Sequence, residues 1–317
     1  MGATPGVQSE TRRLADVPGR RPAGFGAERT TRPSQGNAGR AWRAFRANRL
    51  AVAALVVGLG FALLALGAPL ISRYVTGSGP TDQSLIHNFE APSRQHWLGT
   101  DEYGRDVVTR LLYGARVSLG VAALATLVAA VVGTLVGTLA AFYGGPVDQV
   151  LMRIVDVMLS IPGLYLLLLV SSLVEVGPTA LAVMIALIGW YGLARLIRGE
   201  VLSLRQREFV EAARVSGASG AAIIGRHVMP NVLHVVIVFS TGAIPGYILT
   251  EASLSYLGLC IRAPTPSWGN MLNSSTQYLY KSPGLIFYPG LAITLTVLAV
   301  SIVGNALRDA LDPRLTG

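Results

Sequence analysis

The apolar residues of this chain are gathered into long runs, which polar stretches separate. Six runs come close to or exceed the length of about 20 residues that a helix needs to cross the hydrocarbon core of a bilayer. We place the predicted spans near residues 50–72, 115–142, 150–173, 179–197, 232–256 and 286–307. The pattern therefore predicts an all-α integral membrane protein with six transmembrane helices.

Glycines and prolines inside the runs indicate how the spans pack. Gly133 and Gly137 form a GxxxG pattern, which lets two helix backbones approach closely, and packing within this chain is favoured over a dimer contact. Pro162 and Pro245 are expected to kink their spans, because proline lacks the N–H that a helix bonds. A short amphipathic segment at the outer surface would explain three aromatic residues that suit a water–lipid boundary, Trp268, Tyr278 and Tyr280.

Composition and charge support a membrane protein. Of the 317 residues, 51% are hydrophobic and only 14% are charged, whereas a soluble domain carries roughly a quarter charged residues. The net charge of +9 would suit nucleic-acid binding. However, about ten arginines precede the first apolar run, where a basic flank holds a chain end in the cytosol beside anionic lipid. We therefore expect contact with the lipid bilayer and none with nucleic acid.

The arginines also predict the topology. Six spans put both termini on one side, and the segment 195–226 and the end of the chain, with Arg308 and Arg314, are basic. The loop after the first span also carries arginines, but acidic residues there offset them. We expect both termini in the cytosol.

Two parts of the chain differ in composition. Residues 1–40 are rich in Gly, Pro, Ser, Thr and Arg without periodicity, which predicts a disordered basic cytosolic tail rather than a cleavable signal peptide. Residues 41–317 form the transmembrane domain, with a polar cytosolic elbow at about 198–231. The single cysteine, Cys260, excludes an internal disulfide and is interpreted as a small packing residue.

The sequence contains no recognisable catalytic or metal-binding motif. The phosphate-binding pattern GxxxxGK[ST], the zinc pattern HExxH and the nucleophile pattern GxSxG are all missing, and the four histidines fall at no metal-ligand spacing. We therefore predict no catalytic residue, no metal site and no cofactor bound by this chain.

Few ionisable residues lie inside the predicted spans, which disfavours an ion-coupled pump. Arg153 and Asp156 are spaced i, i+3 and are expected to pair near the start of the third span. Glu251 is expected near the outer end of the fifth span, where an anchoring or gating role and simple helix packing are both open.

The stretch "EFVEAARVSGASGAAIIGRHVMPN" (208–231) is too polar to cross a bilayer. It predicts a helix that Gly217 ends, then a second short helix around 219–228 that runs to Pro230, a residue suited to the first turn of the next span. Glu211 can pair with the arginines on either side of it, Arg207 and Arg214. A stripe of mostly small side chains runs along one face of the first helix, at Phe209, Ala212, Ala213 and Ser216. On these residues alone, an ordinary amphipathic loop helix is an equally good interpretation.

The same stretch resembles the EAA motif of bacterial ABC-importer permeases, EAA-x3-G-x9-I-x-L-P. The matching residues are Glu211, Ala212, Ala213, Gly217 and Pro230, while His227 and Met229 stand where the general pattern has Ile and Leu. In that family this loop is the coupling helix, which docks into a cleft on a separate cytosolic ATPase. The resemblance implies that the ATPase-coupling residues are Glu208, Glu211, Ala212, Ala213, Arg214, Gly217 and Pro230.

Three further stretches resemble the C-type subunit of dipeptide and oligopeptide permeases, so that the resemblance covers about residues 40–315. They are "HWLGTDEYGRDVVTRLLYGARVSLG" (96–120), "EASLSYLGLCIRAPTPSWGNML" (251–272) and "GNALRDALDPRL" (304–315). The first is the most specific, and its loop residues also have a physical interpretation. Gly99 and Gly104 permit tight turns, Asp101 and Asp106 can cap turns and helix starts, and Arg105 can pair with either acid. A paired-carboxylate site is the alternative for this loop.

The resemblance implies an ABC importer type I permease fold and a set of partners. These are a second, homologous permease subunit in a heterodimer, two ABC ATPase subunits or domains that use ATP and Mg, and an extracytoplasmic peptide-binding protein, all at the bacterial inner membrane. The implied function is uptake of dipeptides and oligopeptides. Import of nickel or a nickel chelate is the alternative within the family. A stand-alone secondary transporter and a structural membrane protein are the alternatives outside it.

Overall fold

A computed structural model describes residues 37–311 of the chain, so Arg314 and residues 1–36 of the predicted tail (residues 1–40) lie outside the described residues. The last residues of that tail, 37–40, form the start of a helix. Within the described range there is no β-strand, only one isolated bridge between Thr100 and Asp106. The α-helices are α1 (Asn37–Ala47), α2 (Arg49–Ile71), α3 (Val107–Tyr143), α4 (Gly145–Ser160), α5 (Gly163–Leu173), α6 (Pro178–Leu204), α7 (Glu208–Val215), α8 (Gly220–Ile223), α9 (Met229–Tyr256), α10 (Trp268–Ser275) and α11 (Gly284–Leu311). Short 3₁₀ and π turns lie at Ser72–Thr76, Leu85–His87, Ile224–Val228 and Thr276–Tyr278.

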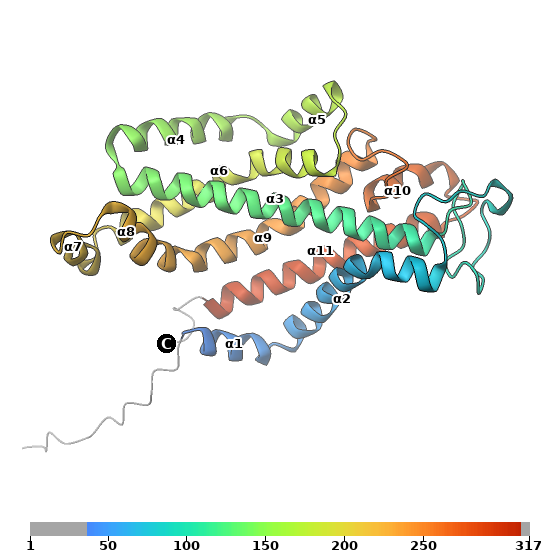
Figure 1. The fold of residues 1–317 in the computed structure, drawn as a ribbon, viewed down its shortest axis with the longest axis horizontal. Coiled ribbons are helices and arrows are strands. Elements are labelled where there is room, and N and C mark those ends of the chain that lie inside the picture. The colour runs from blue at the N-terminus through green and yellow to red at the C-terminus, as the bar shows by residue number, and fades with distance from the viewer. Residues whose placement is uncertain (1–36, 312–317) are drawn as a thin grey trace, which may run out of the picture. The chain divides into compact units, whose positions relative to one another are not determined.

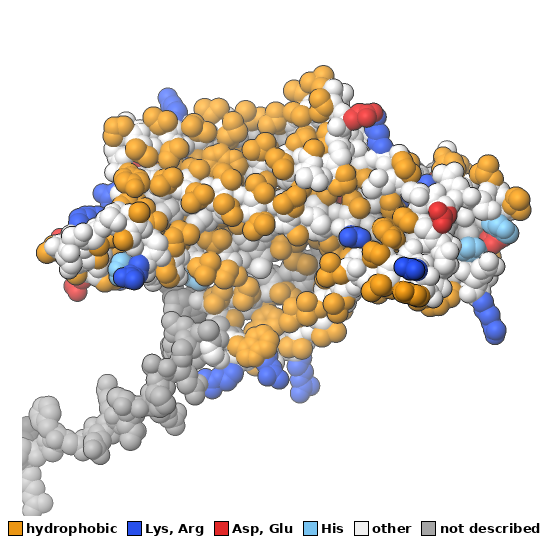
Figure 2. Space-filling model, in the orientation of Figure 1, with side chains coloured by type: hydrophobic (Ala, Val, Ile, Leu, Met, Phe, Trp, Pro, Cys, Tyr) orange, Lys and Arg blue, Asp and Glu red, His pale blue; other side chains and the backbone are white. Residues whose placement is uncertain are grey.

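The long helices run along one another and make an all-α bundle (Figure 1). Five helical segments in the described range are long and apolar enough to cross a membrane, and a sixth is obtained if α4 and α5 together form one broken span. The five are Arg49–Thr76, Val107–Tyr143, Pro178–Leu204, Gly220–Tyr256 and Gly284–Leu311. Figure 2 shows apolar side chains over the middle of this face, with most charged side chains toward its ends. The prediction of an all-α membrane protein is confirmed.

The third predicted span is broken rather than kinked. α4 ends at Ser160, α5 begins at Gly163, and the two axes meet at 79°. Pro162 has no N–H to continue α4, and it forces the residue before it, Ile161, into an extended conformation (φ −93°, ψ 123°). Pro245, by contrast, lies inside the unbroken helix α9.

The closest helix contact joins α3 to α6, which lie side by side and run in the same direction. A Cβ on Gly133 would lie 2.7 Å from the backbone oxygen of Trp190, and one on Gly137 would lie 3.0 Å from Cβ of Ile197. Bulkier residues at these two positions would therefore push the helices apart. This confirms that the GxxxG pattern packs helices within the chain.

The short helix α10 lies at the end of the bundle where α3 begins (Figure 1). Ser267 and Asn270 cap it reciprocally, as each side chain accepts from the other residue's backbone N–H (3.2 and 3.0 Å). Trp268 is only 1% exposed, and its indole edge meets the ring of Phe61 at 5.8 Å. The expectation that Trp268 lies at the membrane boundary is therefore wrong, whereas Tyr280 is fully exposed.

The glycine contact between α3 and α6 generates a stability prediction. Gly137→Val should destabilise the membrane-extracted protein by about 1–3 kcal/mol, because the added methyl groups overpack the interface. The measurement is the midpoint of thermal unfolding. Gly120→Val is the matched control, because a Cβ at that exposed position of α3 meets nothing within 4 Å. Equal midpoints for the two variants would contradict the prediction.

Candidate functional site

The polar elbow joins α6 to α9 at one end of the bundle (Figure 1). Its start is tied to α3, because Arg205 donates through Nη1 to the backbone oxygen of Ala141 (2.7 Å). Val210 is the one fully buried side chain of α7. It belongs to an apolar cluster with Ala141, Leu193, Ile197, Val201, Leu204, Ile223, Val228 and Val232. The short helix α7 is thus held by one side chain that enters the bundle.

The prediction that Gly217 ends the first helix is confirmed. Gly217 has φ +81°, in the left-handed region that favours glycine. Its N–H donates to the carbonyl of Arg214 (3.0 Å), and the N–H of Ala218 donates to the carbonyl of Ala213 (3.1 Å). These two bonds are those of the Schellman motif, which satisfies the last carbonyls of a helix. The chain direction after α7 therefore depends on the backbone conformation of Gly217.

The prediction of a separate second helix around 219–228 is wrong. α8, the π turn and α9 form one helical segment, Gly220–Tyr256. Pro230 cannot donate a backbone hydrogen bond, and the wider π turn just before it is closed by Met229 N–H and the Ile224 carbonyl. The helix widens at this point and continues, so the fifth span begins inside the predicted elbow.

Most of the predicted coupling residues are on the surface. Those exposed are Glu208, Glu211, Ala212, Arg214, Gly217 and Pro230. Ala213 is half-buried against the apolar cluster, so only Phe209, Ala212 and Ser216 of the predicted stripe are exposed. The expected pairs of Glu211 with Arg207 and Arg214 are not formed among the described residues. Val215 is 84% exposed. α7 therefore presents free charges and an apolar side chain, with little of its own surface packed.

The glycines of the outer loop, between α2 and α3, form tight turns as expected. Gly99 has φ +78° and Gly104 has φ +70°. A Cβ at Gly99 would clash with the backbone oxygen of Glu90, and one at Gly104 with that of Ser84. The loop is therefore closely packed against itself, backbone to backbone.

Asp101 is the centre of this loop. Its Oδ1 accepts from the backbone N–H groups of Tyr103 (2.9 Å) and Arg105 (3.0 Å), and its Oδ2 lies 2.7 Å from Nε of Arg105 and 3.3 Å from Nε of Arg110. Arg105 is 2% exposed and lies over the ring of Tyr103. Burial, with repulsion from Asp101, raises the pKa of Glu102 above its usual value. The sequence left open whether Arg105 pairs with Asp101 or Asp106, and the structure pairs it with Asp101. The part played by Arg110 was not predicted.

Asp106 caps α3, as predicted. Its Oδ1 accepts from the backbone N–H and the hydroxyl of Thr109 (2.8 and 2.9 Å), and its Oδ2 lies 3.0 Å from Nδ1 of His96. Both carboxylates of the motif are thus buried and fully engaged within the loop. This arrangement suits a rigid fold and offers no free pair of carboxylates.

Charged pairs between α4 and α6 were not foreseen. Asp156 pairs with Arg195, so the expected pair of Arg153 with Asp156 is wrong. Asp148 accepts two hydrogen bonds from Arg198, at 2.6 Å each. These partners are 39 and 50 residues apart in the chain, and no local spacing connects them.

Glu251 lies deep inside the bundle. It is fully buried, and its Oε1 accepts from the hydroxyl of Ser255 (2.8 Å). Glu251 lies near the end of α9, as predicted, and its burial favours helix packing over an anchoring or gating role.

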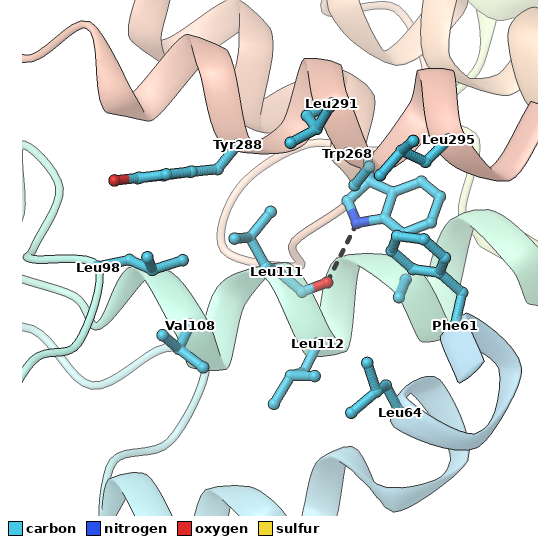
Figure 3. Close-up of a pocket in the computed structure, with 12 residues that line it drawn as sticks. Phe61, Leu64, Leu98, Val108, Leu111, Leu112, Trp268, Tyr288, Leu291 and Leu295 are labelled. Carbon is cyan, nitrogen blue, oxygen red and sulfur yellow. Dashed lines mark hydrogen bonds between the residues drawn. The ribbon is translucent and has the colours of Figure 1, made fainter. Parts of the chain in front are cut away.

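An apolar pocket of about 250 Å³ lies between α2, α3, α10 and α11 (Figure 3). Leucines from α2, α3 and α11 line it, together with Phe61, Trp268 and Tyr288. Trp268 satisfies its own indole N–H by donating to the carbonyl of Leu111 (3.1 Å), so this group is not free to bind a ligand. No group of three His, Cys, Asp or Glu side chains that could hold a metal ion is present between residues 37 and 311.

Comparisons with known proteins agree on one family. Residues 133–317 match the family model described as "Binding-protein-dependent transport system inner membrane component", and residues 37–92 match "N-terminal TM domain of oligopeptide transport permease C". A dipeptide transport system permease protein of Bacillus subtilis is 39% identical over 293 residues, which cover 91% of this chain and 89% of the relative. An oligopeptide transport system permease protein of the same organism is 35% identical over 270 residues (85% and 87%). A glutathione transport system permease protein of Pectobacterium atrosepticum is 39% identical over 266 residues (83% and 87%).

The buried charges of the outer loop can be tested by neutralising their centre. Asp101→Asn should destabilise the loop by about 3 kcal/mol, because it removes the carboxylate charge that pairs with the buried Arg105 and Arg110. Limited proteolysis of the loop in membranes measures the effect as faster cleavage. Glu90→Gln is the control, since it removes only an exposed pair with His87 and should cost less than about 1 kcal/mol. Unchanged cleavage of the Asp101 variant would show that the loop does not depend on this carboxylate.

Proposed function

This chain belongs to the binding-protein-dependent transport system inner membrane component family, and from that membership we propose that it is the permease subunit of an ABC importer for dipeptides and oligopeptides. The observation that carries the proposal is the exposed helix α7, with its glycine cap, at the end of the bundle. A helix with so little of its own surface packed has a surface available for a partner protein. We assign that surface to the cleft of a cytosolic ATPase.

The proposed coupling residues divide into two groups by their place in the fold. Glu208, Glu211, Ala212 and Arg214 are exposed on α7 and would contact the ATPase. Gly217 and Ala213, with Pro230 at the start of α9, would set the angle between α7 and the fifth span. Val210 attaches α7 to the bundle, so a displacement of α7 would be transmitted to α6 and α9 through the apolar cluster around this side chain.

The other subunits follow from the family. The importer would contain a second, homologous permease, two ATPase subunits or domains that use ATP and Mg, and an extracytoplasmic binding protein. ATP hydrolysis would lie in the partners, and this chain would be non-catalytic. It would lie in the bacterial inner membrane with both termini in the cytosol, an orientation that the arginine distribution supports.

The residues of the outer-loop motif have a different proposed role. Gly99, Asp101, Gly104, Arg105 and Asp106 would keep the outer end of α3 in one conformation, beneath the binding protein. Their buried ion pairs and tight turns support this.

Peptides are the proposed substrate because relatives that are 35–39% identical are named as dipeptide, oligopeptide and glutathione transport proteins. Deletion of this subunit in its host should reduce the uptake of labelled di- to oligopeptides to background and leave nickel uptake unchanged. Complementation with the intact chain is the control. Loss of nickel uptake with normal peptide uptake would assign the chain to nickel import, and ion-driven uptake without an ATPase would point to a secondary transporter.

The coupling role predicts a specific transport defect. Gly217→Val should strain the turn by about 1–3 kcal/mol, because a β-branched residue rarely adopts φ +81°. The substitution lies outside the spans, so membrane insertion and assembly with the second permease should be retained. Uptake and the ATP hydrolysis stimulated by loaded binding protein should fall together, and both are measured in reconstituted vesicles.

Gly225→Val is the control for this experiment. It adds the same side chain eight residues further along the chain. The backbone φ there is not positive, and nothing lies within 4 Å of the added Cβ. Wild-type uptake and hydrolysis in the Gly217 variant would show that the elbow is only a connecting loop.

A further inference from the structure

The face formed by α4 and α6 carries charged side chains at the depth of the membrane. Arg195 lies about 26 Å along α6 from Pro178 and about 14 Å from Leu204, at 1.5 Å per residue. If a hydrocarbon core of about 30 Å is centred on this helix, Arg195 lies inside it. Its partner Asp156 lies on α4, and the two side chains are 55% and 53% exposed. A charged pair so exposed would be costly against lipid tails.

The same face contains the break between α4 and α5. A helix end leaves backbone carbonyls and N–H groups without intrahelical partners. Backbone of this kind is tolerated at membrane depth only where protein buries it or where it lines a water-filled cavity. Leu164 and Tyr165, just after the break, are 51% and 71% exposed, so this chain does not bury the region.

The opposite condition holds on α3. Its exposed stripe in the middle of the membrane consists of Leu127, Val131, Leu135 and Leu139, with neither a charge nor a break. Such a stripe suits lipid tails. The Asp156–Arg195 pair and the interrupted helix therefore lie on the α4–α6 face and not along this stripe.

We infer that the α4–α6 face lines the water-filled part of the transport pathway, and that Asp156 and Arg195 contact the charged ends of a peptide in transit. This inference rests on the proposed importer function. A short peptide carries an α-ammonium group and an α-carboxylate, which are complementary to Asp156 and Arg195 respectively. The pair is exposed enough to exchange its internal contact for the peptide. The neighbouring pair, Asp148 with Arg198, is bidentate and only 19% and 33% exposed, which suits a fixed link between the two helices.

Water access to the face can be measured by cysteine labelling in the complete transporter, reconstituted in lipid nanodiscs with Cys260→Ser. Ser160→Cys places a thiol on the same side of α4 as Asp156, four residues further on, at an exposed position. Leu135→Cys is the matched control, because Leu135 is 52% exposed and close in depth to Arg195, as Gly137 packs against Ala194. A charged, membrane-impermeant thiol reagent should modify the first cysteine and not the second. Equal reaction at both positions, or none at Ser160→Cys, overturns the pathway assignment.

The proposed contact of Arg195 with the peptide carboxylate can be tested by comparing peptides that have and lack this carboxylate. Arg195→Gln should lower the uptake of a peptide with a free carboxylate roughly three- to fivefold more than that of its C-terminal amide, the scale of a partly solvated charge pair. Uptake is compared at saturating loaded binding protein. Arg198→Gln is the matched control and should affect both peptides equally. An equal effect of Arg195→Gln on the two peptides would mean that the Asp156–Arg195 pair only links α4 to α6.

The two experiments separate this inference from the function on which it rests. Thiol labelling reports water on the α4–α6 face whatever the cargo is. Selective labelling without peptide uptake in the intact transporter would therefore refute peptide import and retain the pathway face. Peptide uptake with no labelling at Ser160→Cys would retain peptide import and show that the partner subunit or lipid covers this face.

Discussion

The close contact of α3 with α6 is the constraint on which the rest of the bundle depends. Lipid tails are as apolar as the side chains of these helices, so the hydrophobic effect does not drive the helices together, and they associate through close packing instead. Gly133 and Gly137 allow that packing. α3 then carries α2, α4, α9 and α10 along its length, and α6 continues directly into the elbow. The position of α7 thus follows from a glycine contact inside the membrane, through the cluster around Val210.

The two ends of the bundle are built in opposite ways. The outer loop buries an acid between two arginines and closes turns with glycines that no other residue could replace without a clash. Removing one member of such a buried network leaves unpaired charge, which makes the loop a poor candidate for motion. Helix α7 and the turn after it instead have one buried anchor, Val210, exposed charges and a single left-handed residue. The proposed mechanical link to an ATPase needs the second kind of structure, and the proposed platform beneath the binding protein needs the first.

The sequence predicted features that depend on local chemistry. Span positions follow from the length of apolar runs, and the roles of Gly217 and Asp106 follow from backbone conformation and capping.

Features that depend on the fold were missed or wrong. The pair of Asp156 with Arg195 joins residues 39 positions apart, and the burial of Trp268 results from the capped helix α10 folding onto α3. Proline had two outcomes that its presence alone does not distinguish. It ended α4 before Pro162, whereas the helix continued through Pro230 after a π turn.

The weakest packing in the described part of the chain coincides with its polar features. α4 buries only Val155, and α5 buries only Leu167 and Ser171, although the two together are long and apolar enough to form one broken span. Two ion pairs, rather than an apolar seam, link α4 to α6. A structure selected only for stability would cover such helices with its own side chains. A permease must instead leave polar surface open where a charged cargo passes, and the second subunit then supplies the missing wall. In the proposed importer, the exposed charges, the broken helix and the sparse packing of α4 and α5 therefore share one physical explanation, a pathway that is complete only when two subunits meet.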